Sequence, residues 1–159
     1  MPEALSHSAN RIQDALNALG LKLKVVELPA STRTSAEAAS AIGCSIGQIA
    51  KSIIFRTVET GRPVMVIASG VNRVDEAKIQ TIVGEPIKKA DADFVRKATR
   101  YAIGGVPPIG HLGSTIAIID EDLLKMDEIW AAAGTPNAVF KLSPASLVQM
   151  TGGGVKTIK

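Results

Sequence analysis

The chain has 159 residues, of which 46% are hydrophobic and 21% are charged, and its formal net charge is +3. This balance is typical of one soluble globular domain, and the mild positive charge permits a polyanionic partner without requiring one. Cys44 is the only cysteine and there are two histidines, which excludes an internal disulfide and a Cys/His zinc site. We therefore expect no metal and no cofactor.

Targeting and membrane signals are not visible in the sequence. No apolar stretch approaches the roughly 20 residues that cross a bilayer, and residues 1–10 lack the basic and apolar segments of a signal peptide. We expect a cytoplasmic protein without a membrane partner. Because helix and strand patterns alternate throughout, with neither a repeat nor a linker, residues 1–159 are predicted to form a single domain.

The first half of the chain contains, in order, a helix over 8–19, a strand over 21–28, an alanine-rich helix over 34–43, a capped turn over 45–51, and strands over 52–58 and 64–69. Thr34 with Glu37 three residues later forms a capping box, and Ser45 with Gln48 repeats the device. The two strands flank residues 59–63, a turn-rich segment typical of a hairpin. They should therefore pair in the antiparallel direction.

The second half contains, in order, a helix over 75–83, a strand over 85–90, a helix capped by Asp91 or Asp93 that runs to Arg100, a loop over 102–111, strands over 115–119, 127–132 and 138–142, and a helix from Ser143 to Gly152. These elements predict a mixed α/β domain. The hairpin argues against a purely parallel, doubly wound sheet, so we expect a mixed or largely antiparallel one.

Three features of the chain could carry chemistry, and each has a plain structural alternative. Two adjacent glycines followed by two prolines, at 104–108, could aim backbone N–H groups at a carbonyl oxygen, or could form a connecting turn. Lys51 could be functional or a solvated charge at a helix end. The basic residues Arg96, Lys97 and Arg100 could bind phosphate or form a solvated helix face. A Cys44/His111 pair is a further candidate, although a structural cysteine is the simpler interpretation.

Several segments together resemble a known family. Lys51-Ser52-Ile53-Ile54-Phe55, the strand that ends in Ser69-Gly70, the loop from Gly104 to His111 and Ala117-Ile118-Ile119-Asp120 occur in this order. They resemble the YbaK/ProX family of aminoacyl-tRNA deacylases, which also occurs as the inserted editing domain of bacterial prolyl-tRNA synthetases. The resemblance covers roughly residues 12–152, and Gly104 to Pro108 matches the family's G-x-x-x-P motif.

The resemblance implies a curved, mixed, largely antiparallel and partly barrel-like sheet flanked by helices. It implies hydrolysis of the ester between an amino acid and the terminal adenosine of tRNA, assisted by a free ribose hydroxyl, so that no protein nucleophile is needed. It leaves open whether prolyl-tRNA synthetase is a partner, and the oligomeric state is also open. It assigns catalytic roles to Lys51, Gly104, Gly105 and Pro108, substrate-binding roles to Ser52, Ser69, Val106, Pro107, His111, Ala133 and Gly134, and tRNA-binding roles to Arg96, Lys97 and Arg100.

Two departures from the family concern the amino acid that is removed. The alanine-specific branch typically has Asn where this chain has Ser52, and the cysteine-specific branch has a Ser-Gly-Gly segment near residues 131–134. That stretch offers no hydroxyl before Thr135, which favours proline tRNA carrying alanine or 2-aminobutyrate. Seryl-, threonyl- or cysteinyl-tRNA, and a binding module without catalysis, are the alternatives.

Overall fold

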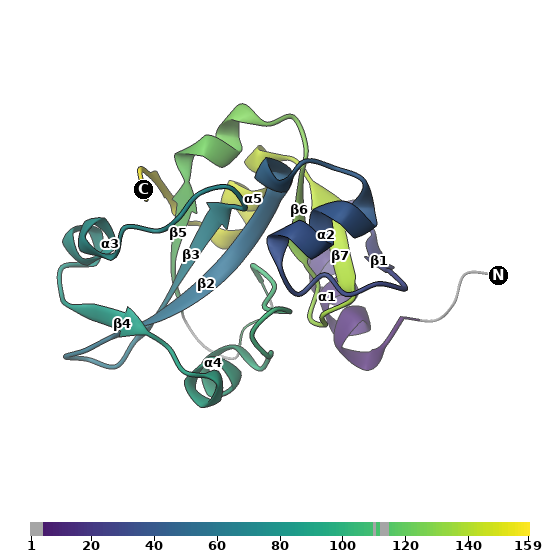
Figure 1. The fold of residues 1–159 in the computed structure, drawn as a ribbon. Coiled ribbons are helices and arrows are strands. Elements are labelled where there is room, and N and C mark those ends of the chain that lie inside the picture. Colours follow the sequence, from purple (N-terminus) through teal and green to yellow (C-terminus); the bar gives the residue numbers. More distant parts are fainter. Residues whose placement is uncertain (1–4, 110, 112–114) are drawn as a thin grey trace.

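The computed structural model describes residues 5–109, 111 and 115–159, so residues 1–4 of the N-terminal stretch and Gly110 of the predicted loop lie outside the described part. The described helices are α1 (His7–Ala18), α2 (Ser35–Ile42), η1 (Ile46–Gln48), α3 (Glu76–Val83), α4 (Ala92–Thr99), η2 (Glu121–Lys125) and α5 (Pro144–Thr151) (Figure 1). The described strands are β1 (Val25–Glu27), β2 (Ile49–Thr57), β3 (Pro63–Ser69), β4 (Ile87–Lys89), β5 (Ile116–Asp120), β6 (Ile129–Ala132), β7 (Ala138–Leu142) and β8 (Gly154–Lys156).

The α-helices begin close to where the capping residues predict. The Thr34 side chain accepts a hydrogen bond from the Glu37 N–H at 3.1 Å, and the Asp91 side chain accepts one from the Phe94 N–H at 2.8 Å. Each bond satisfies one of the amide groups that the first helical turn leaves unpaired. Gly43 ends α2 with a left-handed φ of +86°, a conformation that glycine adopts without steric cost.

The strands form one mixed sheet in the order β1-β7-β6-β2-β3-β5-β8, with β4 paired to β2. The predicted hairpin is confirmed, because β2 and β3 pair antiparallel from Ala50 opposite Ser69 to Arg56 opposite Pro63. Antiparallel ladders also join β1 to β7, β7 to β6 and β4 to β2, whereas β6 with β2, β3 with β5 and β5 with β8 are parallel. The path from β1 to β8 stays open, so the sheet is curved and mixed without closing into a barrel.

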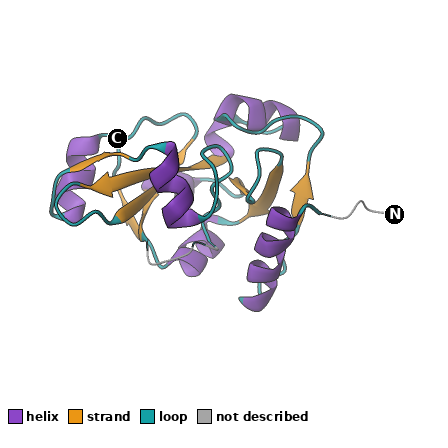
Figure 2. Ribbon diagram, turned by 90° about the horizontal axis from the view of Figure 1, so that it is seen from below, coloured by secondary structure: helices purple, strands orange, loops and turns teal. Residues whose placement is uncertain are grey.

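Helices cover both faces of the sheet (Figures 1 and 2). Alternation along β2 explains this, since successive side chains of a strand point to opposite faces. Ala50 and Ile54 face the larger buried cluster, to which α1, α4 and α5 contribute. Phe55 faces a second cluster with Ile79 of α3, and Ile49 packs under α2 in a third. None of the helices in the described part of the chain has the length and apolar character that a bilayer-spanning helix needs.

The elements differ from the prediction at several points, and the first strand is among them, since β1 begins at Val25 and not at residue 21. We expected Lys51 at the end of a capped turn, but η1 is only three residues long and β2 begins at Ile49. The pairing of Ile49 and Ala50 with β6 extends the strand toward the turn, so Lys51 lies inside β2. Strand β8 was not predicted, because its three residues are all exposed and carry no apolar alternation.

A buried carboxylate joins β3, β5 and η2. Asp120, which is 1% exposed, accepts hydrogen bonds from the Ser69 N–H at 3.0 Å and from the Asn72 side chain at 2.7 Å. Its other oxygen accepts the Asp122 N–H at 2.9 Å, which caps η2. The turn after β3 therefore depends on a side chain from the C-terminal end of the neighbouring parallel strand β5.

We expect Asp120→Ala to lower the free energy of unfolding by about 2–3 kcal/mol, because it leaves the buried Ser69 N–H without an acceptor. Urea unfolding measures this change. The exposed neighbour serves as a control: Glu121→Ala should change the same quantity by less than about 0.5 kcal/mol. Equal effects of the two substitutions would contradict the proposed role of Asp120.

Candidate functional site

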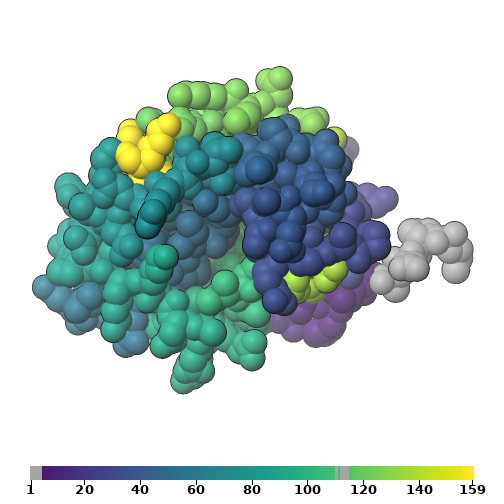
Figure 3. All heavy atoms as spheres, viewed as in Figure 1, coloured from purple at the N-terminus to yellow at the C-terminus, as the bar shows by residue number. Residues whose placement is uncertain are grey.

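A pocket of about 410 Å³ lies between the start of α2, the edge of β2 and the loop that follows α4. The space-filling view shows this face hollowed between the α2 segment and that loop, with β2 behind (Figure 3). Its lining comprises Thr32, Arg33, Thr34, Ser35, Ala38, Ile49, Ala50, Lys51, Ser52, Ile53, Gly70, Ile103, Gly104, Val106, Trp130, Ala131, Ala132 and Val139. Lys51, Ser52, Gly104 and Val106 are thus brought together from segments about fifty residues apart in the sequence, as the sequence motifs lead one to expect.

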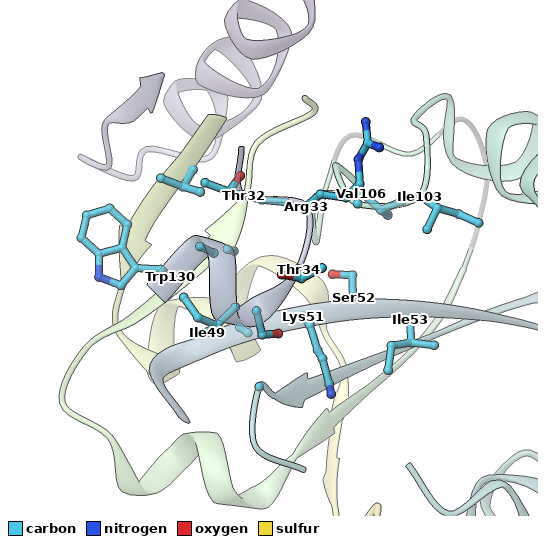
Figure 4. A pocket seen from close by; sticks show the side chains of 18 residues that line it. Thr32, Arg33, Thr34, Ile49, Lys51, Ser52, Ile53, Ile103, Val106 and Trp130 are labelled. Atoms are coloured by element: carbon cyan, nitrogen blue, oxygen red, sulfur yellow. The ribbon is translucent and has the colours of Figure 1, made fainter. Parts of the chain in front are cut away.

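Lys51 and Ser52 extend from opposite sides of β2 (Figure 4). Ser52 points toward Thr34 at the start of α2, whereas the Lys51 side chain points away from it, toward the end of β3. Burial lowers the pKa of the Lys51 amine, and the charge of Asp120 partly opposes that shift. None of the ion pairs formed within the described residues includes Lys51, so its charge is available to a ligand.

Gly104 and Arg33 pack against each other at the mouth of the pocket. Gly104 has a φ of +94°, and a Cβ atom on it would lie 2.7 Å from the Arg33 Cγ. The stem of Arg33 therefore lies across this glycine, while its guanidinium group extends past Val106 (Figure 4). Arg33 is exposed and, within the described residues, takes part in no ion pair.

Gly105 belongs to the framework of the loop. Its N–H donates to the Ala102 carbonyl and its own carbonyl accepts from the Gly134 N–H, both at 3.0 Å. The N–H of Gly105 is therefore occupied, although the sequence led us to expect it to face a ligand. A Cβ atom on Gly105 would lie 3.0–3.2 Å from the Thr135 backbone, so glycine permits the loop to dock on the turn after β6.

The structure places other predicted site residues outside the pocket lining. Ser69 is fully buried and donates its hydroxyl to the Gly47 carbonyl at 2.7 Å. Ala133 is fully buried in the larger core cluster, and the Gly134 N–H is taken by Gly105. Within the stretch 131–134, Ala131 and Ala132 line the pocket. The lining as a whole is not free of hydroxyl groups, because Thr32, Thr34, Ser35 and Ser52 contribute to it.

Pro107, Pro108 and His111 lie on the other side of the loop. Pro107 and Pro108 are buried, and Pro108 and His111 line a separate cavity of about 150 Å³ together with Met65 and Met150. The His111 ring contacts the Pro107 carbonyl at 2.6 Å and the Thr115 hydroxyl at 3.2 Å. Burial lowers the pKa of His111, and the bond to Pro107 opposes this shift. The imidazole thus contacts the loop on the side that faces away from the large pocket.

The predicted tRNA-binding residues lie on α4, immediately before the pocket loop. Arg96, Lys97 and Arg100 are all exposed. Lys97 pairs with Asp93 at 3.0 Å, in a bridge that is largely open to solvent. Arg100 ends the helix with a left-handed φ of +82°. All three charges therefore lie at the C-terminal end of α4, in the segment that leads into the pocket loop.

Cys44 and His111 are parts of different structures. Cys44 packs against a small cluster around Ala38, Ala39 and Ile49, whereas His111 lines the smaller cavity. Burial raises the pKa of the Cys44 thiol, and a backbone hydrogen bond only partly offsets this. A raised pKa disfavours the thiolate that nucleophilic catalysis requires. Within the described residues, no group of three His, Cys, Asp or Glu side chains is arranged to hold a metal ion.

The sequence profile of the family described as "Aminoacyl-tRNA editing domain" matches residues 29–150 of this chain. The chain belongs to the family of aminoacyl-tRNA editing domains. The matched range contains β2, the Gly104–Pro108 segment and β6, and hence the pocket lining.

Relatives of this editing domain occur alone and within a larger protein. The crystal structure of a candidate trans-editing enzyme for prolyl-tRNA synthetase is 49% identical and superimposes with a TM-score of 0.93, over 98% of this chain and 99% of that chain. The uncharacterized protein YwhH of Bacillus subtilis (strain 168) is 29% identical over 127 residues, which is 80% of each chain. The proline–tRNA ligase of Thermoanaerobacter sp. (strain X514) is 27% identical over 99 residues, which span 60% of this chain and 17% of the ligase.

The residues that sequence reasoning missed come mainly from the start of α2. Thr34 was interpreted only as a helix cap, yet capping fixes where residues 32–35 lie, and all four line the pocket of the editing domain. The position of Arg33 could have been inferred from the sequence, because it directly precedes Thr34, the residue that caps α2. Trp130 and Val139 carried no such signal, since their register positions in β6 and β7 are set by the sheet.

We expect Cys44→Ala to have no effect on ester hydrolysis in an assay with mischarged tRNA, because the raised pKa of the thiol disfavours the thiolate and Cys44 packs in a different part of the structure from His111. The measurement is a single-turnover deacylation assay, with and without a thiol-blocking reagent on the parent. Isolation of an aminoacyl thioester on Cys44 would contradict this expectation.

Proposed function

We propose that the protein is an aminoacyl-tRNA deacylase that acts as a separate chain on mischarged tRNA. One observation carries this proposal: in an editing-domain chain, the pocket joins a half-buried lysine from β2 to the glycine of the G-x-x-x-P loop. The similarity to a candidate trans-editing enzyme for prolyl-tRNA synthetase supports proline tRNA as the substrate class.

The reaction is hydrolysis of an activated ester. The oxygen of a water molecule attacks the ester carbonyl carbon, the bond from that carbon to the ribose oxygen breaks, and the ribose oxygen takes up a proton. The free hydroxyl of the terminal ribose is the group that relays the proton. The chain's own contribution is to position the ester and to stabilise the negative charge that develops on the carbonyl oxygen. Lys51 supplies a cation for the acceptor end.

The two ends of the pocket suit the two parts of such a substrate. Ala38, Ala50, Ala131, Ala132 and Val139 provide a small apolar wall, which fits a short aliphatic side chain. Arg33 at the mouth and the exposed cations of α4 provide positive charge for the phosphodiesters of the acceptor end. The volume of about 410 Å³ exceeds what a single small side chain needs, so it leaves room for the ribose.

We propose alanine or 2-aminobutyrate on proline tRNA as the amino acid that is removed. The alanine-rich wall supports this choice, because it accepts a methyl or ethyl group without an unpaired polar atom. Serine or threonine is the second candidate, since Ser35 and Ser52 add hydroxyls to the lining. Thr32 already donates its hydroxyl to the Pro136 carbonyl.

A panel of mischarged proline tRNAs tests the proposed function. The purified chain is presented with alanyl-, 2-aminobutyryl-, seryl-, threonyl- and cysteinyl-tRNA, and with correctly charged prolyl-tRNA as the control. The proposal expects fast release from one or more of the small amino acids and none from prolyl-tRNA. Faster hydrolysis of the seryl-, threonyl- or cysteinyl-tRNA would contradict the choice of alanine. Absence of hydrolysis of every tRNA in the panel would contradict the proposed function.

Lys51→Met should slow deacylation at least about tenfold, since a hydrogen bond to a charged group is worth about 1.5–3 kcal/mol and each 1.4 kcal/mol is a factor of about ten. Methionine keeps the aliphatic stem, so the fold should survive. Lys22→Ala, which removes an exposed lysine between α1 and β1, is the charge-matched control. A parental rate for Lys51→Met, with normal thermal stability, would show that Lys51 is not part of the site.

Arg33→Ala should raise the KM for tRNA several-fold and make the logarithm of affinity less steep against the logarithm of salt concentration by about one unit, because one phosphate contact is lost. Arg62 provides the matched control, since it is an exposed arginine in the β2–β3 turn at the opposite end of the hairpin from Lys51. An identical salt slope for Arg33→Ala and Arg62→Ala would rule out the contact.

A further inference from the structure

One edge of β2 is shared by two strands that leave a gap between them. Strand β3 pairs with the other edge continuously from Ala50 to Arg56. On the shared edge, the ladder with β6 ends at Ala50 and the ladder with β4 begins at Phe55. The intervening residues of β2 therefore have a ladder on one side only.

The geometry of the strand decides which backbone groups face this gap. Successive residues direct their N–H and C=O groups to alternate edges of a strand. The Ile49 carbonyl accepts from Gly70 at 2.8 Å on the β3 side, and the Ile54 carbonyl accepts from Ala90 at 3.2 Å on the β4 side. Ser52 lies two residues before Ile54, so its N–H and C=O both point into the gap.

These two groups of Ser52 are unpaired within the described part of the chain. Neither ladder on this edge includes Ser52, and it makes no other backbone hydrogen bond there. The same edge opens onto the large pocket, which Lys51, Ser52 and Ile53 line. Buried or half-buried backbone groups are nearly always paired with protein, water or ligand. A donor and an acceptor side by side in a pocket wall thus define a binding site.

We propose that the Ser52 backbone holds the aminoacyl group of the substrate, an inference that rests on the proposed function. The Ser52 carbonyl accepts a hydrogen bond from the α-ammonium group, and the Ser52 N–H donates to the ester carbonyl oxygen. An aminoacyl ester carries its ammonium and carbonyl on either side of one carbon, as a residue of a strand carries its N–H and C=O. It therefore pairs with Ser52 as the missing residue of an antiparallel strand would.

This arrangement separates two tasks. The backbone of Ser52 recognises the part that all amino acids share, and it acts in the transition state as well, because its N–H faces the oxygen on which charge develops. The side chains of the alanine-rich wall select the amino acid by size. The Ser52 hydroxyl takes no part in the backbone contact, so a substitution that removes only the hydroxyl is the reference for one that removes the N–H.

Comparison of Ser52→Pro with Ser52→Ala isolates the backbone contact. Proline removes the N–H that faces the gap and leaves the ladder with β3 intact, because proline is accepted where the N–H has no partner strand. Ser52→Ala keeps the N–H and removes only the hydroxyl. We expect Ser52→Pro to have a kcat/KM at least about tenfold below that of Ser52→Ala, with both variants folded as judged by circular dichroism. Equal kcat/KM values for the two folded variants would overturn the proposal.

The α-ammonium contact is tested with the unaltered protein. Proline tRNA is acylated with alanine or with propionate, which lacks only the amino group, and each enzymatic rate is divided by the uncatalysed rate for the same ester. We expect the rate enhancement to be at least about tenfold lower for propionyl-tRNA. Equal enhancements would overturn the proposal, and this comparison decides if Ser52→Pro does not fold. Absence of hydrolysis of every aminoacyl-tRNA by the parent would instead refute the proposed function on which the inference rests.

Discussion

The antiparallel ladder between β2 and β3 is the constraint on which the rest of the structure depends. It runs without interruption from Ala50 to Arg56 and fixes which side chains of β2 face each layer of helices. A shift of one residue would exchange Lys51 with Ser52 and would bury the wrong set in both clusters. The same ladder fixes which backbone groups of β2 point away from β3. The register of the sheet therefore determines which side chains and backbone groups of β2 line the pocket.

The turn that follows β3 extends this constraint to the floor of the pocket. Asp120 binds the Ser69 N–H and the Asn72 side chain, so the end of β5 decides where Gly70 lies. A Cβ atom on Gly70 would lie 2.4 Å from the Ile46 carbonyl and 2.9 Å from the Ser35 Cβ. The start of α2 and the turn after β3 are therefore in direct contact at this point. Burial lowers the pKa of Lys51, and the charge of the same carboxylate that holds the turn partly opposes this shift.

The local structure is predictable from the sequence where a single residue determines it. Thr34, Asp91 and Ser143 cap helices that begin next to them, and Gly43 ends α2. The local structure is not predictable where pairing with a partner strand decides it. Lys51 was expected at the end of a turn, but pairing with β6 draws the neighbouring residues into β2. Strand β8 has no sequence signal of its own, and it exists because β5 offers it an edge.

The candidate site was predictable in its motif residues and not in its boundary. Lys51 and Gly104 could be named from their order in the chain, whereas the hydroxyls at the start of α2 could not, because no local pattern shows that residues 32–35 meet residue 104. Nor could the free edge at Ser52 be found from sequence. It arises because β6 and β4 pair with different parts of β2, and a gap between two ladders leaves no trace in the apolar pattern of the strand.

The residues of the glycine–proline loop divide into those that line the pocket and those that hold the loop in place. The Gly105 N–H donates a hydrogen bond to the Ala102 carbonyl, and the Gly105 carbonyl accepts one from the Gly134 N–H. The Pro107 carbonyl accepts a hydrogen bond from the His111 ring. Only Gly104 and Val106 of this segment reach the pocket together with Ile103. Gly105 docks the loop on the turn after β6, and Pro107 and Pro108 pack on its other side with His111, so that both sides of the loop fix the position of Gly104 beside Arg33. Because this wall of the pocket is made of loops that hold each other, the spacing of the motif has a mechanical reason that is independent of the chemistry at the ester.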